Sequence, residues 1–515
     1  MAYSLSRDIP DFIEGYGPVK KYGGQGAVGE RSKSSAKTRS YPVGHKKLVP
    51  SLEELLDRLP LHDGMTISFH HHFRNGDLLT NMVMLAIAKR GYKDIHLAIS
   101  GIFPCHDPLI PLFQEGVITK ITTSTFNPGG VAKAISRGEL KNPCVLMSHG
   151  GRARAIESGD LHIDIAFIAS PTADENGNLC GYIGKSACGV LSYIYADAQY
   201  ADYVVAVTDD LQPSPLHPRE ITQELVDYVL VVDTVGDPSG IVSGTTKITD
   251  DPIRLKIAEN AANVIEATGL LKEGFSFQTG ASGTALAVAD YVKKRMIELD
   301  IKGSFGLGGI TGYFADMLDQ GLFRVLYDTQ DFDLGAVSSI SKHSNHIPIS
   351  SGLYASPVNK GAIVNYLDAV ILGATEIDLA FNVNVVTGST GTIIGASGGH
   401  CDCAAGAKLT IIVSNLTRKK FCIVRDRVTT ITTPGSTVDV LVTERGIAVN
   451  PKRPELEAAL KAFGLEIVSI EQLKEIGESI VGPQSKADVT DRIVGVVEYR
   501  DGSVIDLVYQ VASQA

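Results

Sequence analysis

The chain has 515 residues, of which 44% are hydrophobic and 20% are charged, and it contains 52 glycines. This length and apolar content predict two or three α/β domains with sizeable cores and many strand-to-helix turns. The formal net charge of -11 argues against nucleic acid or an anionic membrane as a general partner, because either would select a basic surface.

The cysteines and the N-terminus indicate the compartment. The seven cysteines are odd in number and form no CxxC pair, which is typical of reduced thiols in a cytosolic protein. The N-terminal segment lacks the order of a signal peptide, and no run of about 18 apolar residues is available to span a bilayer. We therefore expect a cytoplasmic protein with no membrane partner.

Residues 1–48 are rich in Gly, Ser, Lys and Arg and show no sustained apolar periodicity. They predict a basic arm that lies on the surface or on a partner, or else a flexible leader. A helix is then expected from Ser51, which forms a capping box with Glu54. The following strand, polar loop, helix and strand have the order that gives parallel pairing.

Four segments of the first half recur in the same order in the second half. Residues 61–90, 113–126, 162–172 and 201–211 are echoed by residues 271–296, 318–332, 366–376 and 407–416. A repeat at a spacing of roughly 200 residues is too long for a solenoid and predicts two similarly folded, open α/β domains. We expect the active site in the cleft between them.

The domain boundary is expected near residue 245, where Gly, Pro and Ser are frequent. The first domain would then span residues 49–245 and the second domain residues 246–515. The second domain would carry a C-terminal strand-helix-strand extension that has no counterpart in the first half.

The segment 367–407 carries the strongest candidate for chemistry. An apolar strand leads to Glu376 and Asp378 and then to a Gly-rich loop. When residues 162–172 are aligned in sequence with residues 366–376, Thr172 falls opposite Glu376, so only the second half has a carboxylate at this point. A carboxylate beside free backbone N–H groups can act as a nucleophile or orient one, although a solvated strand end is an equally good place for a glutamate.

Several Gly-rich turns follow strand-like segments and would meet in the cleft: residues 70–77, 148–152, 278–283, 306–311 and 395–402. Backbone N–H groups at such turns favour anions, and Arg74 and Arg152 add full charges. Together these features predict a ligand that is rich in carboxylates or bears phosphate. The sequence has no P-loop and no dinucleotide fingerprint, so ATP and NAD are not expected.

A second hypothesis is a metal site built from His and Cys side chains: His70, His71, His72, His149, His400, Cys401 and Cys403. Adjacent histidines on a strand point to opposite faces, and no second pair of ligands has zinc spacing. We therefore expect no bound metal. A purely structural scaffold is disfavoured by the asymmetry at Glu376.

Several long motifs resemble the α subunits of citrate lyase, the citrate CoA-transferase subunits: DGMTISFHHHFRNGDLLTNMVM, SHGGR, KEGFSFQTG, LGGIT, GATEIDLAFNVNVVTG, GASGGHCD and VDVLVTERGIAVNPKRPEL. They occur in order from about residue 50 to the C-terminus. The ATEIDL segment is also similar to the wider family of acetate and hydroxybutyrate CoA-transferases, whose catalytic glutamate matches Glu376.

The resemblance implies an exchange of acyl groups on a thioester: acetyl-[acyl-carrier protein] and citrate would give citryl-[acyl-carrier protein] and acetate. It implies that Glu376 forms first an acyl anhydride and then a glutamyl thioester. Transfer to and from free CoA is the alternative. Donors for the oxyanions would come from Gly395, Ser397, Gly398 and Gly399, and from the side chains of Asn382 and Asn384.

Citrate would need fixed positive charge and a polar contact, for which His71, Arg74 and Arg152 are the candidates, while Asp378 would orient Glu376. The chain would bind no cofactor of its own, because the thiol belongs to a CoA or dephospho-CoA-like group on a small γ subunit. A β subunit would cleave the citryl thioester, and the chain would form a homo-oligomer within the complex. The basic arm is expected to dock the acidic carrier.

Overall fold

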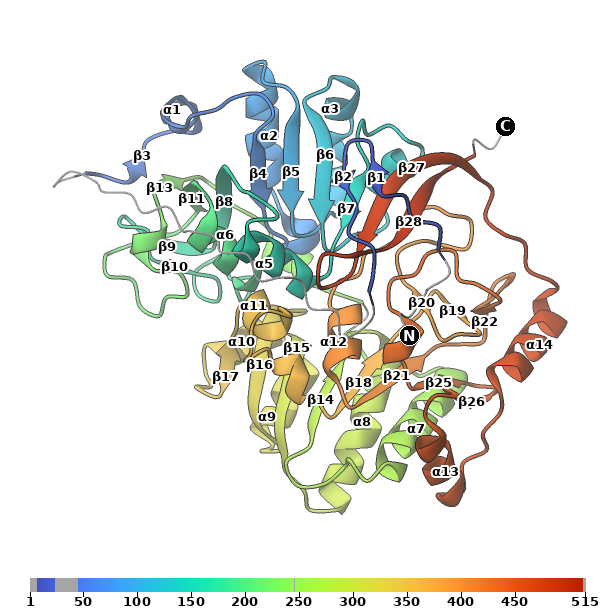
Figure 1. Cartoon of the computed structure of the whole chain (residues 1–515). Helices are drawn as coiled ribbons and strands as arrows, with labels where there is room; N and C mark the ends of the chain where they lie inside the picture. Colours follow the sequence, from blue (N-terminus) through green and yellow to red (C-terminus); the bar gives the residue numbers. More distant parts are fainter. Residues whose placement is uncertain (1–6, 24–44, 245, 513–515) are drawn as a thin grey trace.

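Two large, mostly parallel β-sheets organise the chain, as Figure 1 shows for a computed structural model that describes residues 7–23, 45–244 and 246–512. Within these residues one sheet has ten strands and the other has eight. Helices pack on the sheets, as expected for open α/β domains. The predicted fold class is therefore confirmed.

The first sheet has the strand order β28-β27-β7-β6-β5-β4-β8-β11-β13-β3. The strands from β27 to β3 pair in parallel, and β28 is antiparallel to β27. Their bounds are β3 (Leu48–Val49), β4 (Thr66–Phe69), β5 (Ile95–Ile99), β6 (Ile118–Thr123), β7 (Cys144–Leu146), β8 (Ile165–Ser170), β11 (Tyr203–Thr208), β13 (Tyr228–Val231), β27 (Val489–Glu498) and β28 (Val504–Val511).

The second sheet has the order β17-β16-β15-β14-β18-β21-β25-β26, and only the last pair is antiparallel. Its strands are β14 (Ser276–Thr279), β15 (Gly303–Ile310), β16 (Phe323–Asp331), β17 (His346–Pro348), β18 (Ala369–Leu372), β21 (Leu409–Val413), β25 (Val440–Thr443) and β26 (Gly446–Val449). The run β17-β16-β15-β14-β18-β21-β25 corresponds strand by strand to β7-β6-β5-β4-β8-β11-β13, so the predicted duplication is present in the topology.

Each half also has a small three-stranded sheet at the end of a central strand. These sheets contain β9 (Thr172–Asp174), β10 (Leu179–Cys180) and β12 (Leu211–Gln212) in the first half, and β19 (Glu376–Asp378), β20 (Val383–Asn384) and β24 (Val424–Arg425) in the second. Two hairpins are formed by β1 (Phe12–Ile13) with β2 (Gly17–Pro18), and by β22 (Thr417–Arg418) with β23 (Phe421–Cys422).

The α-helices are α1 (Leu52–Arg58), α2 (Leu79–Lys89), α3 (Pro111–Gln114), α4 (Gly130–Ser136), α5 (His149–Ser158), α6 (Tyr195–Tyr200), α7 (Pro252–Ala267), α8 (Gly283–Glu298), α9 (Gly312–Asp319), α10 (Leu334–Ile340), α11 (Ser351–Ala355), α12 (His400–Gly406), α13 (Pro454–Ala462) and α14 (Ile470–Val481). Helix α1 begins after Ser51 as predicted, and the Ser51 side chain accepts a hydrogen bond from the N–H of Glu54. The Glu54 carboxylate pairs with Arg58 instead of completing the capping box.

No helix of the described segments is long and apolar enough to cross a membrane.

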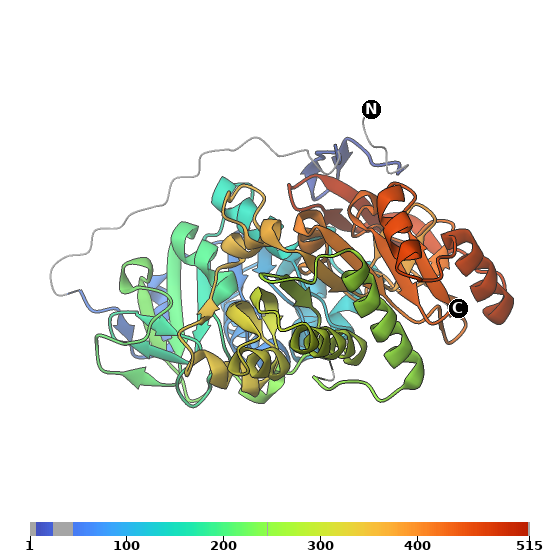
Figure 2. The ribbon, with the colours of Figure 1, turned by 90° about the horizontal axis from the view of Figure 1, so that it is seen from below.

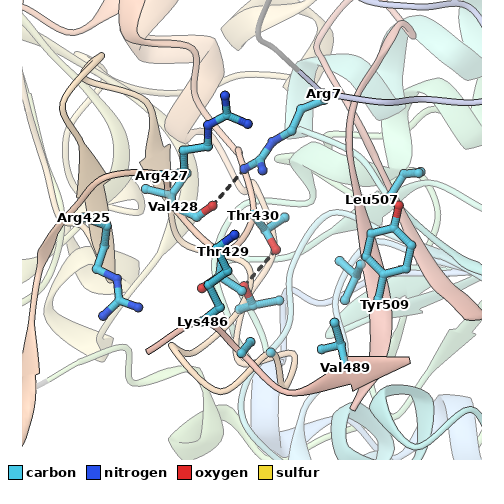
Figure 3. Close-up of a pocket in the computed structure, with 14 residues that line it drawn as sticks. Arg7, Arg425, Arg427, Val428, Thr429, Thr430, Lys486, Val489, Leu507 and Tyr509 are labelled. Carbon is cyan, nitrogen blue, oxygen red and sulfur yellow. Dashed lines mark hydrogen bonds between the residues drawn. The ribbon is translucent and has the colours of Figure 1, made fainter. Parts of the chain in front are cut away.

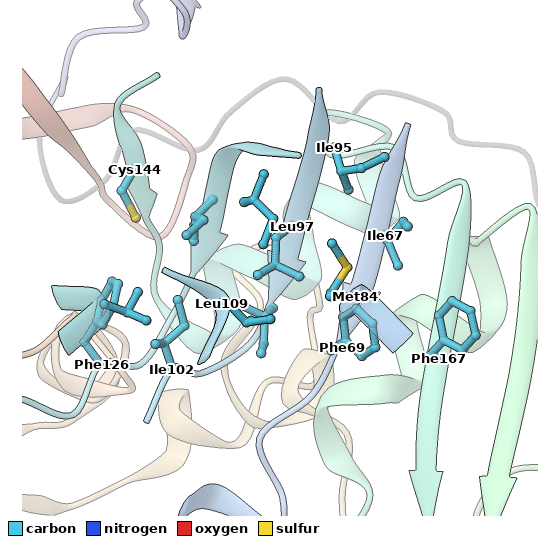
Figure 4. Packing of buried hydrophobic residues seen from close by; sticks show 14 of the residues in the cluster. Ile67, Phe69, Met84, Ile95, Leu97, Ile102, Leu109, Phe126, Cys144 and Phe167 are labelled. Atoms are coloured by element: carbon cyan, nitrogen blue, oxygen red, sulfur yellow. The ribbon is translucent and has the colours of Figure 1, made fainter. Parts of the chain in front are cut away.

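The core of the first domain forms between its sheet and the helices that follow each strand. Figure 4 shows side chains from β4, β5, β8 and α2 that pack together without reaching the surface: Ile67, Phe69, Ile95, Leu97, Phe167 and Met84. The rings of Phe69 and Phe167 stack with centroids 5.5 Å apart. Burying each such side chain contributes about 1.5–3 kcal/mol, which makes the sheet a rigid support for the loops at its ends.

The C-terminal hairpin corrects the predicted domain boundaries. Strands β27 and β28 were assigned to the second domain, but they extend the first sheet next to β7, as Figure 1 shows. The extension also has two helices, α13 and α14, where one was predicted. An edge strand such as β7 has unpaired backbone groups, and pairing with β27 satisfies them.

Part of the N-terminal arm has a defined place. Ile9 and Ile13 are buried in one cluster with Val496, Val504 and Leu507 of the C-terminal hairpin. Figure 2 shows the arm and the hairpin together at one end of the molecule. The alternative of a flexible leader is therefore wrong for residues 7–23, while residues 24–44 lie outside the described part of the chain.

Candidate active site

Glu376 is the first residue of β19 and is completely buried. Its Oε2 atom accepts hydrogen bonds from the N–H of Thr429 at 2.7 Å and from the amide of Asn384 at 3.0 Å. Its Oε1 atom accepts a hydrogen bond from the Thr429 hydroxyl at 3.2 Å, and the Nε atom of Arg425 lies 3.8 Å away. Both carboxylate oxygens therefore have partners inside the protein, as a buried carboxylate requires.

The partners of Glu376 differ from those predicted. Asn384, a predicted oxyanion donor, gives its amide to Glu376 and to the carbonyl and hydroxyl of Thr387. Thr429 and Arg425 were not among the predicted site residues, and they lie about 50 positions downstream of Glu376, after and on β24. No spacing rule could have linked them to Glu376, because the contact depends on how β24 pairs with β19.

Asp378 and Asn382 form a turn that occurs in both halves. The Asp378 carboxylate accepts hydrogen bonds from the N–H groups of Ala380 and Asn382 and from the amide of Asn382. In the first half Asp174 accepts the same bonds from the backbone and amide of Asn178. A contact that both halves share is explained by folding, and no hydrogen bond joins Asp378 to Glu376 among the described residues.

A basic pocket lies beside Thr429, as Figure 3 shows. Its volume is about 250 Å³, and it is lined by four cations: Arg7, Arg425, Arg427 and Lys486. Arg7 donates to the carbonyl of Val428 at 2.8 Å and pairs with Asp506 at 2.9 Å. The arm, the segment after β24 and the C-terminal hairpin thus meet directly beside Glu376.

A second group of polar side chains lies where the two domains meet. His71, just after β4, is buried, and its Nδ1 atom is 2.7 Å from the hydroxyl of Ser100. Its ring lies 4.3 Å from that of Tyr193 and 5.6 Å from that of His149. Burial, with nearby cations, lowers the pKa of His71 well below its usual value, so this histidine is neutral at pH 7. Its Nε2 atom has no hydrogen-bond partner within the described residues.

Arg74 is a buried cation beside this histidine. Its guanidinium lies 4.9 Å from the ring centre of Phe103 and 5.4 Å from that of Phe332, and Nη1 donates to the Oε1 atom of Gln330 at 3.3 Å. Burial lowers the pKa of Arg74 to about 10, which leaves it charged at neutral pH.

No carboxylate of the described residues pairs with Arg74, and its Nε atom has no hydrogen-bond partner. Its φ angle of 53 lies in the left-handed region, which costs a non-glycine residue about 1–3 kcal/mol. A buried and uncompensated charge held by a strained backbone is unfavourable for folding alone. These features therefore indicate an anionic ligand.

The Gly-rich loop 395–399 reaches the same group of side chains. The N–H of Gly398 donates to the carbonyl of Ser124, and its carbonyl accepts from the N–H of His149, both at 2.8 Å. Gly398 has a φ of 53, and a Cβ atom there would lie 3.6 Å from His149 Nε2. The structure therefore brings this loop together with His71 and Arg74, across the two domains.

Two of the predicted oxyanion donors in this loop are already engaged in backbone hydrogen bonds. The N–H groups of Gly395 and Gly398 already donate to backbone carbonyls. The buried hydroxyl of Ser397 has no partner among the described residues, so it is available as a donor to a ligand. Gly399 is needed for space, because a Cβ atom there would lie 2.4 Å from the hydroxyl of Tyr354.

Arg152 is held in a buried ion pair instead of facing a ligand. Its two Nη atoms each lie 2.8 Å from an oxygen of Asp197, and Nη2 also donates to Ser68. This bidentate arrangement neutralises the charge. The structure therefore gives Arg152 a packing role inside the first domain, which differs from the predicted contact with citrate.

Two of the predicted His and Cys ligands, His400 and Cys403, are engaged in other contacts. His400 bonds to Thr433 at 2.7 Å and to the carbonyl of Gly373 at 2.8 Å, and Cys403 lies 2.7 Å from the hydroxyl of Tyr354. In the described residues, the groups with the spacing of metal ligands are His162 with Asp164 and Asp202, and Asp328 with Asp331 and His346. Neither group contains a predicted ligand.

A larger pocket opens at the C-terminal ends of β14, β18 and β21. Its volume is about 740 Å³, and Thr375, Val385 and His400 are among its lining residues. His400 directly follows the Gly-rich loop. In open α/β sheets the ends of parallel strands are the usual place for a ligand, so this pocket offers an approach to the loop from solvent.

The doubled open α/β fold, with a loop and an uncompensated cation at the domain interface, has the two-domain architecture that the resemblance to CoA-transferases implied. The model of the family described as "Citrate lyase, alpha subunit (CitF)" matches residues 45–511. The chain belongs to this family, and the resemblance found in the sequence is confirmed. It is thus a CoA-transferase-type enzyme subunit.

Individual relatives agree with this assignment. The citrate lyase alpha chain of Escherichia coli (strain K12) is 49% identical over 466 residues, which are 90% of this chain and 91% of that one. A crystal structure of the alpha subunit of citrate lyase from Streptococcus mutans, in complex with citrate, matches with 46% identity and a TM-score of 0.94 and covers 99% of both chains. The alpha subunit of malonate decarboxylase from Acinetobacter baumannii shares the fold alone, with 15% identity and a TM-score of 0.62 over 85% of this chain and 93% of that one.

Proposed function

We propose that the chain exchanges the acyl group on a thioester, so that acetyl-[acyl-carrier protein] and citrate give citryl-[acyl-carrier protein] and acetate. The observation that carries the proposal is the charge of Arg74, which is buried at the domain interface without a carboxylate partner among the described residues. A carboxylate of citrate would supply the missing partner. The complex of the Streptococcus mutans relative with citrate supports this substrate.

The exchange needs two nucleophilic steps. A citrate carboxylate attacks the acetyl carbonyl, the carbon–sulfur bond breaks, and the products are an acetyl citrate anhydride and a thiolate. The thiolate then attacks the citryl carbonyl of the anhydride, which releases acetate and forms the citryl thioester. Each step passes through a tetrahedral oxyanion, for which the Ser397 hydroxyl is the proposed donor, while His71 contacts the substrate as a neutral donor.

Glu376 has a positioning role in this proposal. The route that the family resemblance implied, in which Glu376 forms an anhydride and then a glutamyl thioester, needs a carboxylate that can reach the acetyl carbon. Both oxygens of Glu376 are bound by Thr429 and Asn384, and no part of the residue is exposed. We therefore assign the attack to citrate itself, and the covalent route through Glu376 is the alternative.

The partners follow from the family. An alpha subunit is part of a multi-subunit enzyme, and we propose that a γ subunit carries the thiol on a dephospho-CoA-like group and that a β subunit cleaves the citryl thioester. A homo-oligomer of this chain within the complex is part of the proposal. Free CoA is the alternative thiol, because the same acyl exchange would proceed with a thioester of free CoA.

The role of Arg74 is tested by the steady-state kinetics of Arg74→Gln with acetyl carrier and citrate. Losing a charge-assisted contact in a buried site costs about 2–5 kcal/mol, so the KM for citrate should rise at least about 30-fold while the KM for the acetyl carrier stays within about twofold. Arg427→Gln is the matched control and should leave both constants unchanged. An unaltered KM for citrate in Arg74→Gln would contradict the proposal.

The route is tested by trapping. The wild-type chain is incubated with acetyl carrier and then with hydroxylamine or borohydride, and the peptide with Glu376 is examined by mass spectrometry. We expect no modification of Glu376, and Glu376→Gln should retain measurable exchange. Stoichiometric modification of Glu376 would overturn direct attack by citrate and establish the covalent route.

A further inference from the structure

Two carboxylates and one imidazole, none of which takes part in the proposed exchange, meet inside the second domain. Asp328 and Asp331 belong to β16 and His346 belongs to the neighbouring strand β17, and all three residues are buried. One ligand atom of each side chain lies within 4.8 Å of those of the other two. The parallel pairing of β16 with β17, in which His346 lies opposite Leu326, brings these distant positions together.

Each carboxylate is held by the surrounding protein through one oxygen. The Oδ1 atom of Asp328 accepts a hydrogen bond from the N–H of Gln330 at 2.7 Å, and the Oδ2 atom of Asp331 accepts one from the N–H of Val190 at 2.9 Å. The remaining oxygen of Asp331, Oδ1, has no hydrogen-bond partner within the described part of the chain. An unpartnered oxygen on a completely buried carboxylate costs free energy, and a bound cation would remove that cost.

The ring of His346 has the contacts of a metal ligand. Its Nδ1 atom lies 3.0 Å from the hydroxyl of Ser339, and its Nε2 atom lies 3.0 Å from the Oδ2 atom of Asp328. If Nδ1–H donates to Ser339, Nε2 keeps a lone pair for a metal ion, and such a hydrogen bond on the far nitrogen is typical of metal-bound histidines. In the other tautomer Nε2–H donates to Asp328, and the group needs no metal.

The protein provides no fixed positive charge for these carboxylates. No Lys or Arg side chain of the described residues forms an ion pair with Asp328 or Asp331. Burial raises the pKa of Asp328 to about 8, and the carboxylates of Glu220 and Asp333 raise it further. Burial, together with Asp328, also raises the pKa of Asp331 well above its usual value. Two carboxylates in this environment need either protons or a metal ion to balance their charge.

The first domain approaches this group through a glycine. Gly189 has a φ of 102, and a Cβ atom there would lie 1.8 Å from the Oδ2 atom of Asp331. Any side chain at this position would collide with the carboxylate, so the loop can donate the N–H of Val190 to Asp331 only because residue 189 is a glycine. The group therefore lies where a loop of the first domain contacts β16 of the second.

We propose that Asp328, Asp331 and His346 bind a divalent metal ion that fixes β16 and β17 against this loop of the first domain. Two carboxylate oxygens and one imidazole nitrogen suit a first-row ion such as Mn²⁺ or Zn²⁺ better than Mg²⁺ or Ca²⁺, which prefer oxygen alone. The expectation of no bound metal concerned other histidines and two cysteines. The role of the ion is structural, and the inference goes beyond the proposed acyl exchange without depending on it.

The proposed ion would also steady one wall of the site beside Arg74. Gln330 lies between the two carboxylates in sequence, accepts a hydrogen bond from Arg74 at 3.3 Å and donates one to the carbonyl of His71 at 3.1 Å. A ligand set that fixes the end of β16 therefore fixes Gln330 as well.

Metal binding is tested by calorimetric titration of the full chain with Mn²⁺ and, separately, with Zn²⁺ after dialysis against a chelator. We expect about one ion per chain for at least one of the two metals. Asp328→Asn/Asp331→Asn should raise the dissociation constant at least about 100-fold, because both anionic ligands are lost. The matched control is His162→Gln/Asp164→Asn, from the other group with ligand spacing, and it should bind as wild type does. Absence of binding in wild type, or an equal loss in the control, would overturn the proposal.

Thermal unfolding separates a metal site from a pair of protonated carboxyls. A saturating concentration of the ion should raise the Tm of wild type by about 3–5 °C, whereas the Tm of the double Asn variant should not respond. If protons alone balance the charge, neither ion raises the Tm of wild type, and the proposal fails. Neither this readout nor the titration depends on acyl exchange, so both remain decisive if the proposed function is wrong.

Ser339→Ala provides a second variant in case the double Asn variant does not fold. Loss of the hydroxyl removes the partner of His346 Nδ1 and leaves the three ligands in place. Its dissociation constant for the ion should rise about 10–100-fold, as expected for a residue that orients a metal-bound histidine. An unchanged constant in Ser339→Ala would refute His346 as a ligand and with it the proposed site.

Discussion

Glu376 and Arg74 are both buried, but they differ in how many partners they have inside the protein. Glu376 has two hydrogen bonds to one oxygen, one to the other and a guanidinium nearby. Arg74 has one bond to the neutral side chain of Gln330 and two aromatic rings. Burial of a charge without a counter-ion costs free energy, so we propose that a ligand neutralises the charge of Arg74.

Asp506 gives a prediction about pH at the same scale. This buried carboxyl accepts hydrogen bonds from the N–H groups of Ile431 and Leu507 and pairs with Arg7. Burial raises its pKa from 3.8 to about 6, against the opposing effect of Arg7. Because the folded chain holds this proton more tightly than the unfolded chain, ionisation of Asp506 destabilises the fold as the pH rises from about 4 to about 6.

The effect is measured as the free energy of unfolding of wild type and of Asp506→Asn between pH 4 and pH 7. Wild type should lose up to about 3 kcal/mol relative to the variant across this range. A relative gain in wild-type stability with rising pH would contradict the raised pKa, because it would mean that the pair with Arg7 outweighs burial.

At the scale of elements, the two halves repeat contacts as well as strands. The turn after β9 and the turn after β19 are both closed by an Asp that binds a following Asn, through Asp174 with Asn178 and Asp378 with Asn382. A contact repeated in both halves arises from the fold that both halves share. Equivalent positions that differ, such as Thr172 in the first half and Glu376 in the second, are not explained by the shared fold.

The repeat supplies a matched pair of variants. Asp378→Ala and Asp174→Ala each leave backbone N–H groups without a partner, which costs about 1–3 kcal/mol. Both should lower the free energy of unfolding by similar amounts and leave the turnover per folded molecule unchanged. If Asp378→Ala alone abolished acyl exchange, Asp378 would have a role in the site beyond its turn.

At the scale of the whole molecule, the two sheets are joined by more than the linker near residue 245. The chain leaves the second domain after α14 and returns to the first sheet as β27 and β28, where the hairpin also covers the arm residues Ile9 and Ile13. This return path ties the two domains together and brings Arg7 beside Arg425. The geometry of the interface therefore depends on the C-terminus.

Removal of residues 485–515 tests this coupling. The truncation exposes the edge of β7 and the apolar contacts of the arm, so the first domain should unfold at a lower temperature while the second domain is little affected. We expect one calorimetric transition for the whole chain and two for the truncated chain. A single transition in both would show that the linker and the interface suffice.

The sequence by itself determined the local elements and their repetition. Ser51 begins a helix because its side chain caps the first turn, and the strand-loop-helix pattern recurs because both halves form the same sheet order. It also placed His71, Arg74 and the loop from Gly395 to Gly399 at the ends of strands, where parallel sheets bring loops together.

Only the tertiary structure determined which of these residues contact one another. Arg152 and Arg74 look alike in the sequence, yet one meets Asp197 and the other meets no carboxylate among the described residues. The partners of Glu376 and the pairing of β27 with β7 are likewise contacts between distant segments. Such contacts leave no periodic pattern, because they are set by the packing of whole sheets and not by the spacing of residues along the chain.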